Sequence, residues 1–158
     1  MAMPIRIRLA QAGEARALGA LCVRSKAYWG YDAEFMRLSY RSLQIDAAAV
    51  EFGRVFVAVD EASNLLGVAD CCELPEPDAF DLLHLFVDPQ ALRRGVGRAL
   101  FEAACAWCVA QGGTKLLILS DPNAAQFYQR LGANLIGEAA SDAIPDRLLP
   151  LLEYRLTR

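Results

Sequence analysis

The chain has 158 residues, 55% of them hydrophobic, and its 16 basic and 19 acidic side chains give a net charge of −3. This length predicts one domain over residues 1–158 with its own core, and the near balance of charge argues against nucleic-acid binding. No run of about 18 hydrophobic residues is present, so we expect no membrane-spanning helix and no membrane partner. The high hydrophobic fraction is consistent with a homodimer that covers spare apolar surface.

The N-terminal residues and the cysteines indicate the compartment. Residues 1–6 lack the hydrophobic segment of a secretory signal. An odd number of cysteines without such a signal favours a reducing, cytoplasmic environment. Cys105 and Cys108 have CxxC spacing, but no second pair of ligands exists, so we expect small buried side chains and no metal site. The full set is Cys22, Cys71, Cys72, Cys105 and Cys108.

The first half of the chain predicts a strand, two helices and a hairpin. Residues 5–9 alternate hydrophobic and basic, which is typical of a half-buried strand. Residues 12–28 and about 32–43 show the hydrophobic spacing of helices. Residues 54–59 and 65–72 are rich in strand-forming side chains and flank a polar turn, so we expect a β-hairpin.

The segment from Leu82 to Leu100 passes from a strand into a helix. Residues 82–87 are almost all hydrophobic, which predicts a strand buried on both faces. A turn at Asp88-Pro89 and a basic loop lead to Gly95-Val96-Gly97. Hydrophobic residues then share one helical face, namely Val96, Leu100, Ala103, Ala104 and Trp107.

The glycines at this junction predict an anion-binding site. The first N–H groups of a helix lack partners within it, and the helix dipole favours negative charge there. Gly95 and Gly97 lack a Cβ, so a ligand can lie against the backbone. Arg93, Arg94 and Arg98 add positive charge. We therefore expect phosphate groups to bind here.

The last third predicts three strands and one helix. Residues 115–120 form a strand, and Asp121 caps a helix that carries Ala124, Phe127, Tyr128 and Leu131 on one face. Residues 134–137 and 148–156 are the last strands, and Pro150 predicts an edge position or a late start for the second. The resulting order, β-α-α-β-β-β-α-β-α-β-β, predicts an α/β (α+β) fold with a mixed, mostly antiparallel sheet and helices on both faces.

The glycine loop does not fit two common phosphate-binding motifs. A dinucleotide-binding loop needs a third glycine where Leu100 stands, and Gly97-Arg98-Ala99 lacks the Lys-Ser/Thr of a Walker loop. Residues 94–100 instead resemble motif A of the GCN5-related N-acetyltransferase (GNAT) family, Gln/Arg-x-x-Gly-x-Gly/Ala. Leu92 stands where that family usually has Gln or Arg.

A second resemblance lies downstream. Residues 121–133 resemble the family's motif B, Asn-x-x-Ala-x-x-Phe-Tyr-x-x-x-Gly-Phe/Ala, with Ala124, Phe127 and Tyr128 in place. Asp121 replaces the leading Asn, and Asn123 is expected to take over its contact. The resemblance implies the acyl-CoA N-acyltransferase fold, in which the central strand and the next strand separate and the pantetheine lies between them.

The same resemblance implies an activity and a coenzyme site. The expected reaction is direct transfer of acetyl from acetyl-CoA, as cosubstrate, to an amine of a small molecule or protein. The residues expected to bind the coenzyme come from the central strand, the glycine loop and motif B. They are Leu85, Phe86, Val87, Arg93, Arg94, Gly95, Val96, Gly97, Arg98, Asn123 and Phe127.

Three side chains are candidates for catalysis. Tyr128 holds the position from which family members protonate the coenzyme thiolate, although core packing alone also accounts for it. Asp81 lies where histone-acetylating members have a glutamate base and, being shorter, would act through water; the alternative is a solvated strand end. His84, the only histidine, is either a base or a satisfied core group. Strand alternation places Asp81 and His84 on opposite faces. A backbone N–H near Leu85 and Phe86 is expected to stabilise the oxyanion.

The acceptor is not specified by the sequence. The aromatic residues Tyr28, Trp29 and Tyr31 either close a helix end or line the acceptor pocket. Acidic residues in nearby loops would suit a cation, namely Asp32, Glu34, Glu76 and Asp78. A second hypothesis is a non-catalytic, coenzyme A-binding regulatory domain, but the presence of Tyr128 favours the enzyme.

Overall fold

The computed structural model describes residues 4–157, so residues 1–3 of the N-terminal segment lie outside it. This part of the chain contains a seven-stranded sheet with the order β1-β2-β3-β4-β5-β7-β6. The strands are β1 (Arg6–Leu9), β2 (Val55–Val59), β3 (Leu65–Glu73), β4 (Ala79–Val87), β5 (Lys115–Leu119), β6 (Asn134–Ala140) and β7 (Leu148–Arg155). The helices are α1 (Ala15–Ala27), α2 (Ala33–Ser39), α3 (Ala47–Phe52), α4 (Val96–Ala110) and α5 (Ala125–Arg130), with 3₁₀ turns η1 (Arg41–Leu43) and η2 (Pro89–Ala91).

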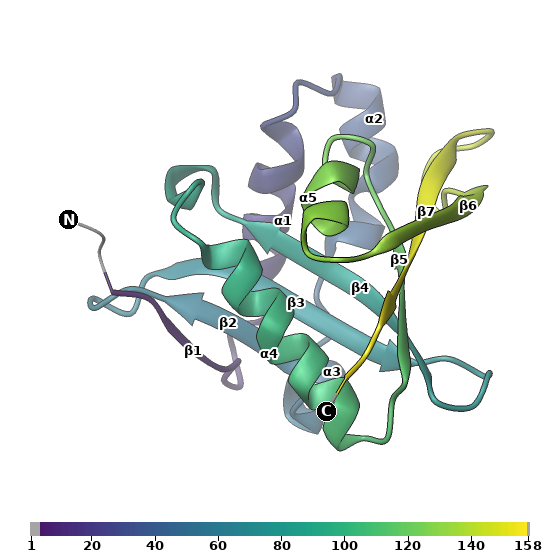
Figure 1. Cartoon of the computed structure of the whole chain (residues 1–158). Coiled ribbons are helices and arrows are strands. Elements are labelled where there is room, and N and C mark those ends of the chain that lie inside the picture. Colours follow the sequence, from purple (N-terminus) through teal and green to yellow (C-terminus); the bar gives the residue numbers. More distant parts are fainter. Residues whose placement is uncertain (1–3, 158) are drawn as a thin grey trace.

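Helices cover both faces of the sheet, as the element order predicts (Figure 1). Alternating residues of β2 and β3 supply two cores, because neighbouring side chains in a strand point to opposite faces. Ala58 and Ala69 pack with α4 and α5, whereas Val57 and Val68 pack with α1 and α3. No helix within residues 4–157 is long and apolar enough to span a membrane.

The expected mixed sheet is confirmed, and its one parallel pair within the described residues is β4 with β5. These strands pair only at Ala79–Lys115, Phe80–Leu116 and Asp81–Leu117. Residues 82–87 of β4 then continue without a partner in β5. The two strands therefore splay apart beyond Asp81, and this splay positions the candidate site.

Several boundaries differ from the prediction. Helix α3 was not expected; Asp46 begins it by accepting a hydrogen bond from the Ala48 N–H, and Gly53 ends it with φ of 82°. The helix expected over 32–43 is α2 followed by the separate turn η1. α5 begins at Ala125 rather than beside Asp121; the Asp121 carboxylate accepts the Asn123 N–H, and residues 122–124 form a turn that leads into the helix.

The C-terminal strand is also placed differently. β7 lies between β5 and β6, so the edge position predicted from Pro150 is wrong and β6 is the edge strand. Pro150 lacks an N–H, but its carbonyl still accepts a hydrogen bond from the Ser120 N–H at 2.9 Å. The prediction that β4 is buried on both faces is wrong as well, because Leu83 is 41% exposed.

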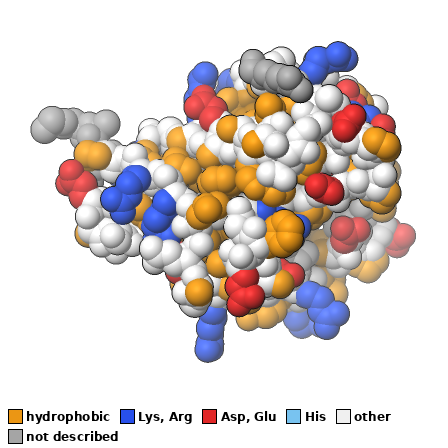
Figure 2. Space-filling model, turned by 90° about the horizontal axis from the view of Figure 1, so that it is seen from below, with side chains coloured by type: hydrophobic (Ala, Val, Ile, Leu, Met, Phe, Trp, Pro, Cys, Tyr) orange, Lys and Arg blue, Asp and Glu red, His pale blue; other side chains and the backbone are white. Residues whose placement is uncertain are grey.

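The surface seen from below has hydrophobic side chains in its middle and charged side chains toward its rim (Figure 2). Positive and negative groups are interspersed on this face, in keeping with the balanced composition. The cysteines are free; Cys22, Cys71 and Cys108 are buried, as expected, and Cys72 and Cys105 are half-buried.

Candidate active site

The start of α4 presents unpartnered N–H groups. Gly95 precedes the helix with φ of 78°, a left-handed conformation that favours glycine. Among residues 4–157 no side chain caps the helix, and its first turn carries no acidic residue. The N–H groups of Val96, Gly97 and Arg98 therefore have no acceptor in the first turn, at the positive end of a 15-residue helix. This geometry fits the predicted anion site.

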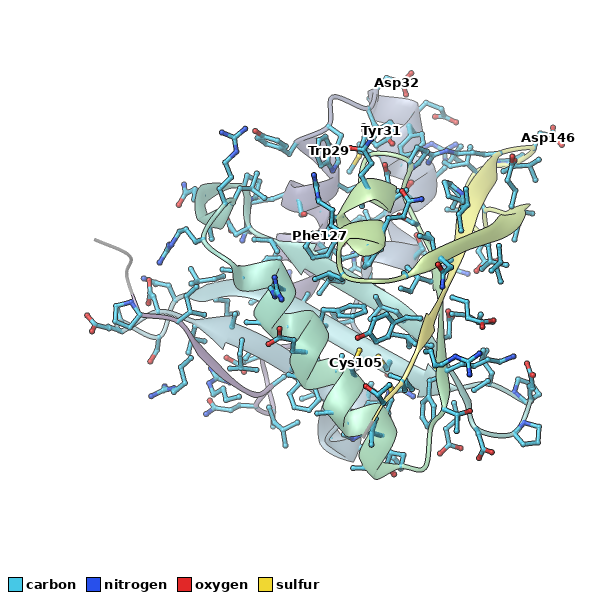
Figure 3. All side chains as sticks on the ribbon, viewed as in Figure 1. Trp29, Tyr31, Asp32, Cys105, Phe127 and Asp146 are labelled. Atoms are coloured by element: carbon cyan, nitrogen blue, oxygen red, sulfur yellow. The ribbon has the colours of Figure 1, made fainter. Side chains whose placement is uncertain are left out.

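Gly97 faces the gap between β4 and α5. A Cβ built on this residue would lie 3.1 Å from Phe127 Cζ and 3.6 Å from Val87 Cγ2. The structure thus brings together Val87, Gly97 and Phe127, three of the residues expected to bind the coenzyme. Figure 3 shows Phe127 between α5 and the start of α4. A ligand bound at the start of α4 can extend along this gap to the space between β4 and β5.

Two of the three arginines lie among groups other than the start of α4. Arg98 pairs with Glu102 at 3.2 Å on the exposed face of α4, and Arg93 is exposed. Arg94 lines a hollow of about 820 Å³ between α1, the β2–β3 turn and the β4–α4 connection. The pKa of Asp60 in this hollow is lowered, chiefly by hydrogen bonds from Asn64 and to a lesser extent by Arg94. The helix backbone therefore supplies positive charge at the site that does not depend on Arg94 or Arg98.

The N–H groups of β4 that face the splay can be assigned from its pairing with β3. The Asp88 N–H donates to the Leu66 carbonyl at 2.8 Å. Because alternate residues of an antiparallel strand direct their N–H groups the same way, the Phe86 N–H also faces β3. The Leu85 and Val87 N–H groups face the splay, where β4 has no partner strand. Of the two residues expected to supply the oxyanion donor, Leu85 is the one correctly oriented.

Tyr128 lies in α5 and is 6% exposed. Its ring packs against Phe127 at 5.2 Å and Phe101 at 6.1 Å between centroids. Burial, together with the nearby Cys71 and Asp121, raises the pKa of Tyr128 well above its usual value. The hydroxyl therefore stays protonated at neutral pH, as a proton donor must.

Asp81 and His84 share one face of the sheet, so the prediction that they point to opposite faces is wrong. The register of β3 and β4 shifts between Asp70 and Cys71, which pair with His84 and Leu82. Leu83 is the extra residue of a β-bulge. Because of this extra residue, the side chains from His84 onward point to the face opposite to the one that simple alternation predicts. This bulge brings Asp81 and His84 to the side covered by α1 and α3.

His84 is held by protein groups at both ring nitrogens. Nε2 lies 2.9 Å from the Ser42 carbonyl oxygen, and Nδ1 lies 3.4 Å from an Asp70 carboxylate oxygen. Arg54 also lies 3.3 Å from Asp70, which is 1% exposed. The sequence interpretation missed Asp70 and Arg54, although a carboxylate inside a hydrophobic strand signals a buried partner. This geometry favours the core-group interpretation of His84.

We expect His84→Ala to cost stability rather than catalysis. Removing the ring leaves the Ser42 carbonyl without this partner and Asp70 with Arg54 alone, so the free energy of unfolding should fall by about 1–3 kcal/mol. Urea unfolding measures this loss. Turnover per folded molecule should stay within about threefold of wild type, whereas loss of a catalytic base costs at least about 100-fold. A drop of the larger size in folded protein would restore His84 as a base.

Asp81 lies where β4 and β5 separate. Burial raises the pKa of its carboxyl group, Asp142 raises it further, and His84 partly opposes the rise. A carboxylate with a raised pKa accepts a proton more readily near neutral pH. The dominance of burial argues against the interpretation of Asp81 as a solvated strand end.

Four polar side chains, one from the end of α1 and the others from three loops, meet around Asp121. With Asp121 they form what we call the Asp121 cluster: Lys26, Tyr31, Asp121, Asn123 and Arg147. Burial alone would raise the pKa of Asp121, but hydrogen bonds from Lys26, the Asn123 N–H and Tyr31 together lower it. Asn123, expected at the coenzyme, donates to Asp121 at 2.9 Å and to Tyr31 at 3.2 Å. The sequence carried no signal for Lys26 and Arg147, which lie 95 and 26 residues from Asp121.

Three of the four acidic residues expected to suit a cation contact other groups of the protein. Asp32 caps α2, Glu34 pairs with Arg37 and Glu76 pairs with Lys115. Asp78 lies in a turn with φ of 63°. Among the aromatic residues, Tyr28 and Trp29 are about half exposed, at 57% and 47%, whereas Tyr31 stacks on Phe35 with centroids 3.8 Å apart.

The splayed strands and the uncapped start of α4 define an acyl-CoA N-acyltransferase fold. A model of the acetyltransferase (GNAT) domain matches residues 51–132, which is more than half of the chain. The chain therefore belongs to the GNAT acetyltransferase family. A comparison with curated proteins gave no significant match.

Solved structures share this fold. A GCN5-related N-acetyltransferase from Rhodopseudomonas palustris has a TM-score of 0.77 at 22% identity over 99% of both chains. PaiA N-acetyltransferase from Thermoplasma acidophilum, solved with coenzyme A, has a TM-score of 0.76 at 15% identity, over 97% of this chain and 99% of PaiA. N-acetylglutamate synthase from Neisseria gonorrhoeae, solved with coenzyme A and N-acetylglutamate, has a TM-score of 0.70 at 22% identity, over 98% of this chain and 36% of the synthase.

Proposed function

We propose that the protein transfers the acetyl group of acetyl-CoA to an amine by direct attack. The observation that carries this proposal is the placement of the bare start of α4 beside the splay of β4 and β5, with Tyr128 in the adjoining helix. The N–H groups of Val96, Gly97 and Arg98 would bind the diphosphate of the coenzyme. The pantetheine would then run along the free N–H groups of Leu85 and Val87.

The chemistry needs a base, an oxyanion donor and a proton donor, and three groups of this arrangement are suited to these roles. An alkylammonium titrates near pH ~10, so a base must accept a proton before the amine can attack. Asp81 takes that proton, directly or through water. The Leu85 N–H stabilises the oxyanion formed on the thioester carbonyl. As the C–S bond breaks, Tyr128 donates its proton to the leaving thiolate, and solvent then reprotonates it.

Release of free thiol from acetyl-CoA, measured across a panel of amines, tests this function. We expect amine-dependent release by the wild-type protein and formation of the N-acetylated amine in equal amount. Tight binding of coenzyme A without turnover on any amine would instead support a non-catalytic, coenzyme-binding regulatory domain. This second hypothesis follows from the family resemblance, which does not assign the role of general base to one definite residue.

Asp81→Asn should lower turnover while it raises the free energy of unfolding. The amide cannot accept the proton, so turnover should fall by about 100-fold. Because burial raises the pKa of Asp81, the charged carboxylate destabilises the folded protein at pH 7, and the neutral amide should raise the free energy of unfolding. This gain should vanish below the ordinary value of 3.8, where both states are protonated.

Turnover assays and urea unfolding at pH 7 and pH 3 measure the two effects. Asp46→Asn, at the exposed start of α3, is the matched control for loss of one carboxylate. Unchanged turnover of Asp81→Asn would contradict the role of Asp81 as base.

A further inference from the structure

The Asp121 cluster carries an excess of positive charge. Lys26 Nζ lies 2.6 Å from Asp121, so this pair is neutral. Arg147 lies farther from the same carboxylate, at 3.9 Å, and its Nη2 donates to the Tyr31 hydroxyl at 3.0 Å. These contacts within residues 4–157 use Nη2 and leave the other edge of the guanidinium free to donate. A planar guanidinium edge of this kind matches a carboxylate, which it binds with two parallel hydrogen bonds.

Two aromatic rings hold Arg147 in place. Tyr31 and Phe35 are stacked with an interplanar angle of 8°. The guanidinium carbon of Arg147 lies 4.8 Å from the Phe35 centroid and 5.3 Å from the Tyr31 centroid. The Arg147 side chain is 19% exposed. Stacking and burial therefore fix its orientation before a ligand arrives, which lowers the entropy lost on binding.

The cluster lies at one side of the splay. Asp121 follows β5 four residues after Leu117, the last residue that pairs with β4, which is about 13 Å along an extended strand. In Figure 3, Tyr31 lies on a different side of α5 from Phe127, beside α2. Phe127 contacts the position of Gly97 at the coenzyme site. Apart from Asn123, which was expected to bind the coenzyme, the cluster therefore consists of residues outside the site expected to hold the coenzyme.

One loop links this cation to the candidate base. The β6–β7 connection carries Asp142 near one end, and the Ser141 N–H beside it donates to the Arg147 carbonyl at 2.8 Å, so the two ends of the connection meet. The charge of Asp142 also raises the pKa of Asp81. The same connection carries Arg147 at its other end. The acceptor side of the splay thus has a negative pole at Asp81 and Asp142 and a positive pole at Arg147. A molecule with an ammonium group and an anionic group matches both.

We propose that the acceptor is an amine that also carries a carboxylate, and that Arg147 binds this carboxylate while the amine lies toward Asp81. This assignment rests on the proposed acetyl transfer and adds the chemical class of the acceptor. It adds an anionic group to the acceptor, whereas the acidic loop residues indicated only that a cation would be suited.

Matched acceptors test the assignment. The panel pairs ω-amino acids of three to six carbons with alkylamines of the same length, and α-amino acids with their amides. We expect kcat/KM to be about 10- to 100-fold higher for the carboxylate member of the best pair, which is the value of one charge-assisted, bidentate contact. Arg147→Gln should remove this preference by raising KM for the acid and should change the uncharged partner little.

Two further variants separate charge from geometry. Arg147→Lys keeps the charge without the planar edge and should retain part of the preference. Arg130→Gln removes one cation from the exposed end of α5 and should leave the preference intact. The melting temperature of each variant identifies any loss caused by unfolding, and Arg147→Lys replaces Arg147→Gln if the latter does not fold.

The outcomes distinguish the acceptor class from the activity. Equal kcat/KM within every pair, with turnover present, would overturn the carboxylate assignment and leave acetyl transfer standing. If no acceptor gives thiol release, the proposed function fails, and titration of N-acetyl amino acids by calorimetry then tests the site alone. Binding to wild type that Arg147→Gln abolishes would support the site, and no binding to wild type would overturn it.

Discussion

Gly97→Val will raise the dissociation constant of coenzyme A by at least about 100-fold. The new side chain would point at Phe127 and Val87, because even a Cβ lies 3.1 Å from Phe127 Cζ. It would fill the gap through which the ligand passes from the start of α4 into the splay. The loss of two charge-assisted hydrogen bonds to the diphosphate, each contributing about 1.5 kcal/mol, gives the stated factor. Isothermal titration calorimetry with coenzyme A measures it.

Two control variants test whether crowding at Gly97 causes the loss of affinity. Ala106→Val adds the same β-branched side chain to an exposed position of α4 and should leave the affinity unchanged. Combining Gly97→Val with Phe127→Ala opens the space again and should recover part of the affinity if crowding is the cause. Wild-type affinity in Gly97→Val would contradict binding along the bare backbone of α4.

Tyr128→Phe should lower kcat by about 100-fold or more, the usual contribution of a positioned proton donor. Coenzyme affinity should change by less than about twofold, because none of the hydrogen bonds within residues 4–157 uses the Tyr128 hydroxyl. The raised pKa of Tyr128 implies that wild-type activity does not decline through loss of this proton at any pH below its ordinary value of 10. Rates of thiol release between pH 6 and pH 9, with calorimetry for affinity, test both statements.

The matched control is Tyr154→Phe, a tyrosine that also packs against Phe101, with centroids 5.0 Å apart. That variant should keep its turnover. If Tyr128→Phe turns over like the wild type, the thiolate takes its proton from another source, and Tyr128 serves only to pack α5 on α4.

The parts of the site that the sequence predicts are those built from neighbouring residues. The start of α4 depends on Gly95 and Gly97, whose roles follow from local backbone geometry. The positions of Phe127 and Tyr128 follow from a spacing within α5. Both features lie on short segments, so pattern and resemblance together located them.

The parts that the sequence did not predict depend on pairing between distant segments. One extra residue, Leu83, bulges from β4 and turns Asp81 and His84 to the same face. Simple alternation cannot reveal such a bulge. Arg147 reaches Asp121 only because β7 inserts between β5 and β6, an order that Pro150 argued against. The charge around Asp121 is therefore a property of the folded sheet.

The amide signals of Val96, Gly97 and Arg98 in a ¹⁵N-labelled sample test the central claim most directly. Coenzyme A should shift these three signals strongly and slow their hydrogen exchange, whereas pantetheine, which lacks the diphosphate, should leave them nearly unchanged. Equal shifts with both ligands, or no shift of these signals with bound coenzyme A, would contradict diphosphate binding at the start of α4.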